Sequence, residues 1–244
     1  VKADHVRQTL DLNAIADPKV KKALERLSNV IKKAESARQV LSNVQQEQVD
    51  EEEVEDMSLL TDAWATGSLS SSVLKRVMPT ISDAKINQYL GHLNNAMAQG
   101  GINTCARQSA FLAQLGHESG DLRYMEEIAS GAAYEGRRDL GNTQPGDGRR
   151  FKGRGPIQLT GRTNYINAGR ALGVDLVNNP TLAATPEWGF KIAVWFWNTR
   201  GLSSYADQNT QSAFDTITKR INGGTNGKAD RDNRWRSAKA ALGC

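Results

Sequence analysis

The chain has few of the residues that build cross-links or metal sites. Its 244 residues include only two cysteines, Cys105 and Cys244, and three histidines. Two cysteines exclude a disulfide framework, and so few cysteines and histidines argue against a zinc cluster. Nothing in the sequence fixes the distance between Cys105 and Cys244, so whether they pair stays open. We expect no metal and no other cofactor.

Long apolar segments are also missing. No run of roughly eighteen apolar residues is present, so we expect no membrane span. The first residues, 1–7, lack the apolar core of a secretory signal, although a signal removed earlier stays open because the chain does not start with Met. An apolar fraction of 39% is nevertheless compatible with a globular protein.

Charge is unevenly spread along the chain. Residues 1–69 hold 9 Lys/Arg and 13 Asp/Glu, a net charge of −4, whereas residues 70–244 hold 22 and 14, a net charge of +8. A basic part suits a polyanionic partner such as a bacterial envelope. Nucleic acid is the rival polyanion, but we find no helix-turn-helix pattern, zinc finger or aromatic RNA-binding motif and expect no nucleic-acid binding. A merely solvated basic surface is the simpler alternative.

Residues 1–69 are predicted to form a helical appendage with an acidic linker. Residues 17–45 read as one long helix, with Asp17 as N-cap and Pro18 in its first position. A heptad-like seam runs along it: Val20, Leu24, Leu27, Ile31, Ala34 and Leu41. This seam either packs on its own domain or binds a second copy or another partner. The acidic run 45–56 and the Ser/Gly-rich stretch 66–72 separate it from residues 70–244.

Residues 70–244 are predicted to be mainly α. Apolar residues recur at helical spacing in 82–99, 104–119, 164–172, 187–199, 211–221 and 231–242. Gly120 is the expected C-cap of the second of these helices. Residues 141–155 hold five glycines and one proline and are predicted as loop, with at most a short hairpin around this stretch. The loop acids Glu135 and Asp147 are expected to be solvated.

Two segments carry the chemistry-bearing residues. Residues 111–120 are the end of an apolar helix that delivers Glu118 to a glycine-terminated tip, and residues 150–160 are a Gly-rich turn that presents Gln158 and Thr160. Partial shielding at the end of an apolar helix favours the protonated carboxyl that a general acid needs. A carboxyl group beside a rigid, polar, Gly-lined cleft suits cleavage of a sugar–sugar bond, which usually needs two carboxylates.

The second carboxylate is predicted to be Glu127, nine residues after Glu118. Nine helical steps turn about 900°, which places the two on opposite faces of an ideal helix. They share a cleft only if the chain turns between them, and Gly120 supplies that turn. Glu126 stays open as the alternative. Two glutamates without further context most often lie on the solvated surface, so the surrounding motif must show whether this pair is catalytic.

Both segments resemble glycoside hydrolase family 19, which comprises chitinases and related bacterial and phage endolysins. The most specific match is the signature Gly-Arg-Gly-Pro-Ile-Gln-Leu followed by Ser or Thr, which stands here as residues 153–160. The resemblance extends over about residues 72–243. It implies a lysozyme-like helical catalytic domain, an inverting mechanism and no metal.

The resemblance also implies roles for individual residues. Glu118 matches the general acid, Glu127 matches the second carboxylate of the phage endolysins, and Thr160 matches a hydroxyl that holds the nucleophilic water. The residues implied to contact substrate or lie near the acid are Gln158, Asn164, Asn222 and Arg231. His117 is expected to make a structural hydrogen bond. The aromatic residues of 187–199 are expected mainly in the core, with one or two lining a sugar site.

Two departures from plant chitinases favour peptidoglycan over chitin as substrate. The chain lacks their many cysteines, and segment 132–142 is short, as in phage or bacterial cell-wall enzymes. We therefore predict an endolysin-type hydrolase that cleaves β-1,4 bonds of peptidoglycan glycan strands. It would act in the periplasm or at the cell wall, phage-encoded or exported by another route. A chitinase with the same residues, and a non-catalytic wall-binding or virion structural protein, are the alternatives.

Overall fold

The computed structural model describes residues 67–244, together with nine scattered residues between Asp17 and Ser36. The chain separates into two units, Val1–Leu59 and Leu60–Cys244. In the first unit, eight of the nine described residues are helical, and the Val20 N–H lies 3.4 Å from Asp17 Oδ1, as expected of an N-cap. The rest of the predicted helix 17–45 and the acidic run lie outside the described residues.

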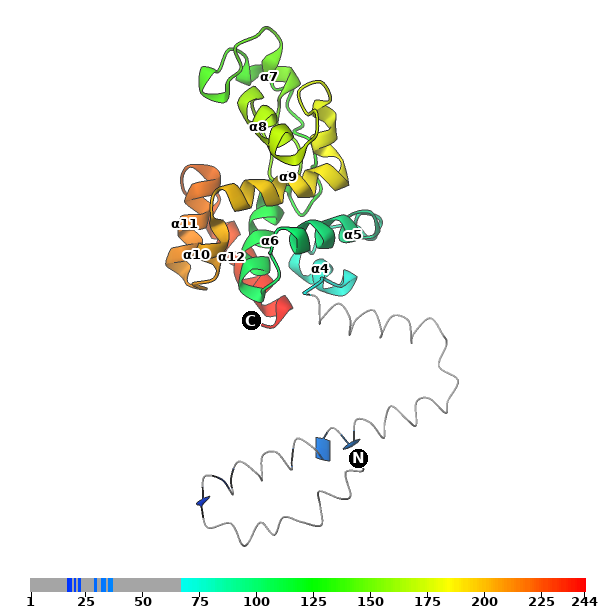
Figure 1. Ribbon diagram of the computed structural model, residues 1–244, viewed down its shortest axis with the longest axis vertical. Coiled ribbons are helices and arrows are strands. Elements are labelled where there is room, and N and C mark those ends of the chain that lie inside the picture. Colours follow the sequence, from blue (N-terminus) through cyan, green and yellow to red (C-terminus); the bar gives the residue numbers. More distant parts are fainter. Residues whose placement is uncertain are drawn as a thin grey trace, which may run out of the picture. The chain divides into compact units, whose positions relative to one another are not determined.

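The second unit is built from helices throughout its described part (Figure 1). In chain order these are α4 (Ser71–Val77), α5 (Asp83–Gln99), α6 (Cys105–Ser119), α7 (Asp147–Arg150), α8 (Arg162–Leu172), α9 (Pro186–Thr199), α10 (Leu202–Ala206), α11 (Gln211–Asn222) and α12 (Lys228–Leu242). Three 3-10 helices lie between them: η1 (Ala132–Tyr134), η2 (Arg138–Leu140) and η3 (Pro180–Ala184). The predicted mainly α fold is confirmed.

No strand is found in residues 67–244. Extended backbone pairs there only as two isolated antiparallel bridges, Glu126 with Arg154 and Arg154 with Leu159. The sequence allowed a short hairpin around the Gly-rich turn, and the structure has only these two bridges there. Also within the described residues, no helix is both long and apolar enough to cross a bilayer, and no group of three His, Cys, Asp or Glu could hold a metal ion.

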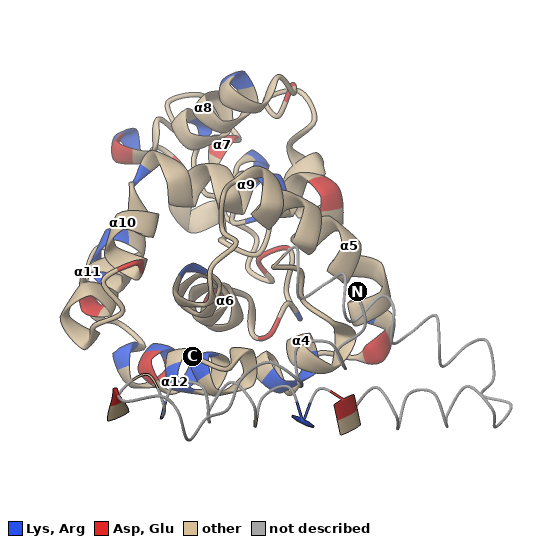
Figure 2. Cartoon of the chain, turned by 60° about the horizontal axis from the view of Figure 1, so that its bottom comes forward, with Lys and Arg blue, Asp and Glu red and all other residues tan. Residues whose placement is uncertain are grey.

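Helix α6 lies at the centre of this unit, seen end-on in Figure 2 with α9, α5, α4, α12, α11 and α10 around it. Ten of its 15 residues are buried. The Thr104 hydroxyl accepts from the Arg107 N–H at 3.3 Å, and Gly120 ends the helix in the left-handed region at φ 57°. Both ends agree with the predicted bounds. A buried central helix holds its last turn, which carries Glu118, in a fixed position.

The turn after α6 is held by buried polar contacts. Asp121 and Leu122 follow Gly120 in the left-handed region, at φ 58° and 60°. The Asp121 carboxylate is buried and accepts hydrogen bonds from the Thr80 N–H at 3.1 Å and the Thr80 hydroxyl at 2.7 Å, and it pairs with Arg234. These contacts offset the backbone strain of two non-glycine residues at positive φ. The chain reverses here and returns to the Gly-rich turn.

Helix α9 supplies a large part of the aromatic core. Its Phe190 packs edge-on against Tyr89 of α5 at a centroid distance of 5.9 Å, and Trp197 packs edge-on against Phe111 of α6 at 5.3 Å. Phe190 and Trp197 are fully buried, so two of the five α9 aromatics lie in the core as expected. The three other α9 aromatics, Trp188, Trp195 and Phe196, are half-buried and border hollows.

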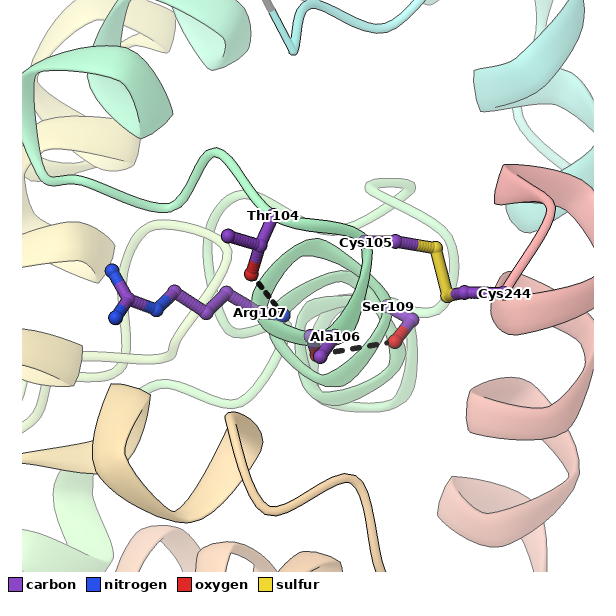
Figure 3. The surroundings of a disulfide bond; sticks show 6 residues. All are labelled: Thr104, Cys105, Ala106, Arg107, Ser109 and Cys244. Atoms are coloured by element: carbon purple, nitrogen blue, oxygen red, sulfur yellow. Dashed lines mark hydrogen bonds between the residues drawn. A yellow bond between two sulfur atoms is a disulfide. The ribbon is translucent and has the colours of Figure 1, made fainter. Parts of the chain in front are cut away.

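A disulfide joins the start of α6 to the C-terminal residue that follows α12. Cys105 at the start of α6 is bonded to Cys244, after α12, with their Cα atoms 6.1 Å apart (Figure 3). The sequence left this pairing open. The bond spans a sequence separation of 139 residues and ties the C-terminus to the central helix.

The six helices predicted after residue 70 are all present, with bounds shifted by at most three residues. The helices that were missed, α4, α7 and α10, have only seven, four and five residues. Helices this short contain too few turns to show a periodic pattern. Leu69 lies one residue before the predicted start of the domain at residue 70. It is buried and exchanges two 2.9 Å hydrogen bonds with Asn94, so it packs on α5 as part of this unit.

Candidate active site

Glu118 lies in the last turn of α6, at the edge of the core. Its side chain is 20% exposed, and Oε1 accepts a 2.5 Å hydrogen bond from Arg231 of α12. The Arg231 side chain is 1% exposed, so it approaches Glu118 from the interior and leaves the other side of the carboxyl open. This burial indicates that Arg231 holds Glu118 in place, and the resemblance likewise implied an arginine near the acid.

Arg231 is held in turn by buried polar groups. Its Nη1 donates to Gln114 Oε1 at 2.5 Å, and its Nε donates to the Asn226 carbonyl at 3.2 Å. Gln114 is fully buried, and its amide nitrogen donates to the Thr218 hydroxyl at 3.0 Å. Helices α6, α11 and α12 therefore share one hydrogen-bond network, which fixes the guanidinium and, through it, Glu118.

His117, the residue before Glu118, makes a parallel contact with α12. Its Nδ1 lies 2.6 Å from Asp230 Oδ2, and Asp230 also accepts from Arg234 Nε at 2.7 Å. Burial opposes the ionisation of Asp230, but the hydrogen bonds from His117 and Arg234 outweigh it and lower the pKa of this carboxyl. A Cβ on Gly227 would lie 2.1 Å from His117 Cε1, so the ring packs directly on that glycine. These contacts favour the structural role expected for His117.

Glu127 is held on both carboxylate oxygens. The Tyr134 hydroxyl donates to Oε1 at 3.0 Å, and the Gly153 N–H donates to Oε2 at 3.1 Å. The Glu127 backbone is fixed as well, since its N–H donates to the Gly153 carbonyl at 2.9 Å and its carbonyl accepts from Lys152 Nζ at 2.9 Å. Burial, together with the hydrogen bond to Glu127, raises the pKa of Tyr134, so the hydroxyl remains a donor. Each carboxylate oxygen keeps a further lone pair to accept a proton.

Glu126 has a different environment. Its Oε1 lies 3.1 Å from Lys152 Nζ and 3.2 Å from Arg154 Nη2. Burial alone would raise the pKa of Glu126, but the hydrogen bonds and charges of Lys152 and Arg154 outweigh it and lower this pKa. A carboxylate paired with two cations is a weak proton acceptor. The two carboxylates thus differ in their partners: two cations for Glu126, and a hydroxyl and a backbone N–H for Glu127.

The Gly-rich turn brings Gln158 next to Glu127. Gln158 adopts a left-handed backbone at φ 54°, and its N–H and Nε2 both donate to the Gly155 carbonyl at 3.0 Å. A Cβ on Gly153 would lie 2.7 Å from Gln158 Oε1 and 3.3 Å from Glu127 Oε2. A side chain at position 153 would therefore displace the end of the Gln158 side chain and press on the Glu127 carboxylate. An uncommon backbone at a motif residue is typical of a functional site.

A hollow of about 350 Å³ opens beside Glu118. Five of the predicted site residues line it: Glu118, Gln158, Thr160, Asn164 and Asn222. The Thr160 hydroxyl donates to the Gln158 carbonyl at 2.9 Å, and Asn164 Nδ2 donates to the Thr160 carbonyl at 2.7 Å. Neither Arg231 nor Glu127 lines the hollow: Arg231 lies behind Glu118, and Glu127 lies next to Gln158 across Gly153.

Several residues of this site belong to no motif of the sequence. The hollow is also lined by Leu140, Phe196 and Arg200. The Arg200 guanidinium lies 3.4 Å from the centroid of the Phe196 ring, and burial lowers the pKa of Arg200. Phe196 matches the expectation that one or two α9 aromatics would line the site. Arg200 and Tyr134 stand in no motif that we recognised, and only the folded chain brings them to the carboxylates.

Comparison with known proteins identifies relatives of this helical unit. The family model of glycoside hydrolase family 19, described as "Chitinase class I", matches residues 91–238. An endochitinase of Solanum tuberosum is 39% identical over 166 residues, which cover 55% of this chain and 50% of that protein. An acidic 27 kDa endochitinase of Solanum lycopersicum is 45% identical over 115 residues, covering 45% and 41%. The chain thus spans about half the length, or less, of these curated relatives.

Solved structures of similar fold match a larger share of this chain and of their own chains. Chitinase C from Streptomyces griseus HUT6037 matches with a TM-score of 0.60 and 25% identity, over 71% of this chain and 92% of that one. A bacterial family 19 chitinase matches with a TM-score of 0.58 and 28% identity, over 71% and 94%. These matches confirm the expected fold class.

Proposed function

The chain belongs to glycoside hydrolase family 19, and on this basis we propose that it hydrolyses β-1,4 bonds in a polymer of N-acetylated sugars. The observation that carries the proposal is the position of Glu118. This carboxyl group is held from inside by Arg231 and borders a hollow lined by Gln158, Thr160, Asn164 and Asn222. A polar, concave site with a fixed carboxyl group is what glycosidic cleavage requires.

The proposed mechanism assigns separate jobs to the two carboxyl groups. Arg231 occupies Glu118 Oε1, so Oε2 is the oxygen that would carry the proton and deliver it to the leaving glycosidic oxygen. Glu127, oriented by Tyr134 and the Gly153 N–H, would take a proton from a water that attacks the anomeric carbon from the opposite face. This single displacement inverts the anomeric configuration. The hydroxyl of Thr160 would help to hold the water.

Chitin is the first substrate we propose. The curated relatives are named endochitinases and the solved structures are named chitinases. These similarities favour the chitinase alternative over the endolysin function that the sequence features suggested. Chitin oligosaccharides are therefore the first compounds to test.

Peptidoglycan is the second candidate, supported by charge. Residues 70–244 carry a net charge of +8, which suits the polyanionic wall of bacteria. Figure 2 shows Lys and Arg, interspersed with Asp, along α12. Both substrates lie outside the cytoplasm, where a disulfide such as Cys105–Cys244 persists, and we propose that the protein acts there.

The test uses the full chain on two substrates in parallel. Chitin hexamers and purified peptidoglycan are each incubated with the protein and with Glu118→Gln, and the products are identified by mass spectrometry. We expect shorter chitin oligomers with reducing ends, formed only by the unsubstituted protein. Release of reducing muropeptides alone would assign peptidoglycan as the substrate instead. Anhydro sugars, or no product from either polymer by the folded protein, would refute a hydrolase.

A further inference from the structure

A second hollow, of about 460 Å³, lies where the ends of α5 and α8 meet α9. We call it the tryptophan groove, because Trp188 and Trp195 of α9 line it and both are half-buried. A Cβ on Gly100 would lie 2.1 Å from Val194 Cγ1, so this glycine allows α5 to end directly against α9. None of the residues assigned to the catalytic hollow lines the groove, and its occupant is not determined by the proposed mechanism.

The two indoles are spaced to suit a linear polymer. Trp188 and Trp195 are seven residues apart, which places them on nearly the same side of α9 and separated by roughly 10 Å along its axis. This rise is close to the length of one disaccharide unit in a β-1,4-linked chain. Such a chain presents the same face on every second sugar, so two sugars of like orientation could stack on the two rings. Indoles combine a flat apolar face with an N–H donor, which suits the mixed surface of a sugar.

The polar groups of the groove favour a neutral ligand. Exposed Gln99 and Asn198 supply amide groups at its edge, and Thr199 supplies a hydroxyl. Lys191 is the lysine of the lining, and its charge is compensated by Glu187 at 2.7 Å while its Nζ lies 4.6 Å from the Trp188 ring centroid. Amides and hydroxyls bind sugar hydroxyl and acetamido groups, whereas a polyanion would require unpaired cations.

The groove adjoins the catalytic hollow along one helix. Trp195 in the groove precedes Phe196 in the catalytic hollow, and Thr199 in the groove precedes Arg200 in the hollow. Residues one position apart on a helix point about 100° apart, so the two hollows open on neighbouring sides of α9. One polymer surface could therefore meet both sites.

We propose that the tryptophan groove is a non-catalytic binding site for a neutral β-1,4-linked N-acetylglucosamine chain, which holds the protein on insoluble polymer. The inference rests on the proposed function for its choice of ligand. It adds a site at which sugar is bound and not cleaved. Binding there strengthens attachment to a polymer with many repeats and leaves the cleavage of short, soluble chains unchanged.

The test separates attachment from cleavage in the full chain. Binding to insoluble chitin is measured by sedimentation in the Glu118→Gln background, where the polymer stays intact. Trp188→Ala with Trp195→Ala should weaken this binding on the order of tenfold, since both stacking surfaces are lost. With Glu118 intact, the same pair should slow hydrolysis of insoluble chitin and leave hydrolysis of a chitin tetramer within about twofold. Trp188→Phe with Trp195→Phe is the matched control, because it keeps both aromatic faces and should keep most of the binding.

Each outcome decides the proposal. Unchanged binding in the folded alanine variant overturns it, and so does weak binding that the folded phenylalanine variant fails to restore. If the double alanine variant unfolds, the single variant Trp195→Ala takes its place. Weaker chitin binding by Trp195→Ala, with binding retained by the phenylalanine variant, supports the proposal. Unchanged chitin binding by Trp195→Ala overturns it. If the protein binds chitin through the groove but cleaves no chitin oligomer, the proposed role of the groove is supported and chitin is refuted as the substrate of the catalytic hollow.

Discussion

Arg231 donates a 2.5 Å hydrogen bond to Glu118 from a position that is only 1% exposed. The next contact along the same two helices pairs His117 with Asp230 at 2.6 Å. Two consecutive residues at the end of α6 are thus held by two consecutive residues near the start of α12. The acid carboxyl group is oriented from the protein interior, and its remaining oxygen is available to the hollow.

Glu118→Gln should abolish most activity and leave the fold intact. The amide keeps the shape of the side chain and can still accept from Arg231, but it has no proton to give. Loss of a general acid costs on the order of 10²–10⁴ in rate. Turnover of a chitin hexamer and the thermal midpoint are measured together. Activity within a few-fold of the parent protein, at an unchanged midpoint, would remove Glu118 from the acid role.

The products should form with inverted anomeric configuration. An inverting enzyme needs carboxyl groups about 6.5–9.5 Å apart, so that a water fits between sugar and base. We expect that separation between Glu118 and Glu127 in a substrate complex. Proton NMR recorded during the first minutes of hydrolysis identifies the initial anomer. A β product from a β-linked substrate would mean retention, and Glu127 would then have to act as a nucleophile.

Tyr134→Phe should lower kcat more than it raises KM. The substitution removes the donor to Glu127 Oε1, 3.0 Å away, without removing the ring. A less firmly oriented base slows proton transfer in the transition state and leaves substrate binding largely intact. We expect a loss on the order of tenfold in kcat. The comparison variant is Glu126→Gln, whose carboxylate pairs with Lys152 and Arg154 and should matter less for turnover. If Glu126→Gln lowers kcat more than Tyr134→Phe does, Glu126 would take the role of base in place of Glu127.

Opening the disulfide should reduce stability without reducing the intrinsic rate. Cys105 and Cys244 close a loop across a sequence separation of 139 residues, and bonds of this kind contribute about 2–5 kcal/mol to the free energy of unfolding. Cys105 lies at the opposite end of α6 from Glu118. Cys105→Ser with Cys244→Ser should therefore unfold at lower urea concentration and keep its turnover at low temperature. Equal urea midpoints for the two proteins would show that the bond is not formed in solution.

Asp147 should make the fold sensitive to acid. The sequence suggested a solvated loop acid, but this carboxylate is 1% exposed and accepts from Arg162 Nε at 2.8 Å and Nη2 at 2.5 Å. The Arg162 hydrogen bond lowers the pKa of Asp147, and burial opposes this only in part. The stabilisation is fully present above the unfolded pKa of about 3.9 and is lost as the pH falls through the lower folded value.

Asp147→Asn tests this contact. The substitution should cost about 1–3 kcal/mol at neutral pH, because the charge of the partly buried Arg162 loses its carboxylate partner. The free energy of unfolding, measured in urea at several pH values, should fall less steeply with acid in the variant than in the parent protein. An equal slope in both proteins would show that Asp147 is not the carboxylate responsible.

Much of the helical scaffold could be predicted from local patterns. The bounds of α5, α6 and α9 follow from apolar periodicity and from capping residues such as Ser82, Thr104 and Gly120, which act within a few residues of themselves. The motif residues Glu118, Gln158, Thr160, Asn164 and Asn222 could likewise be named, and the structure gathers them around one hollow. These assignments depended on short-range signals and on a specific signature.

Other features were decided by contacts between distant parts of the chain. The burial of Arg231 behind Glu118 and the Cys105–Cys244 bond depend on how α6 packs on α12, and the different partners of Glu126 and Glu127 depend on how their segment meets the Gly-rich turn. The groove lined by Trp188 and Trp195 forms where the end of α5, capped by Gly100, meets α9. The sequence by itself determined helices, caps and the family signature, because those are encoded within a few turns. The environment of each carboxyl group was decided by tertiary packing, because its partners come from segments that meet only in the folded chain: Arg231 lies 113 positions from Glu118, and Gly153 lies 26 positions from Glu127.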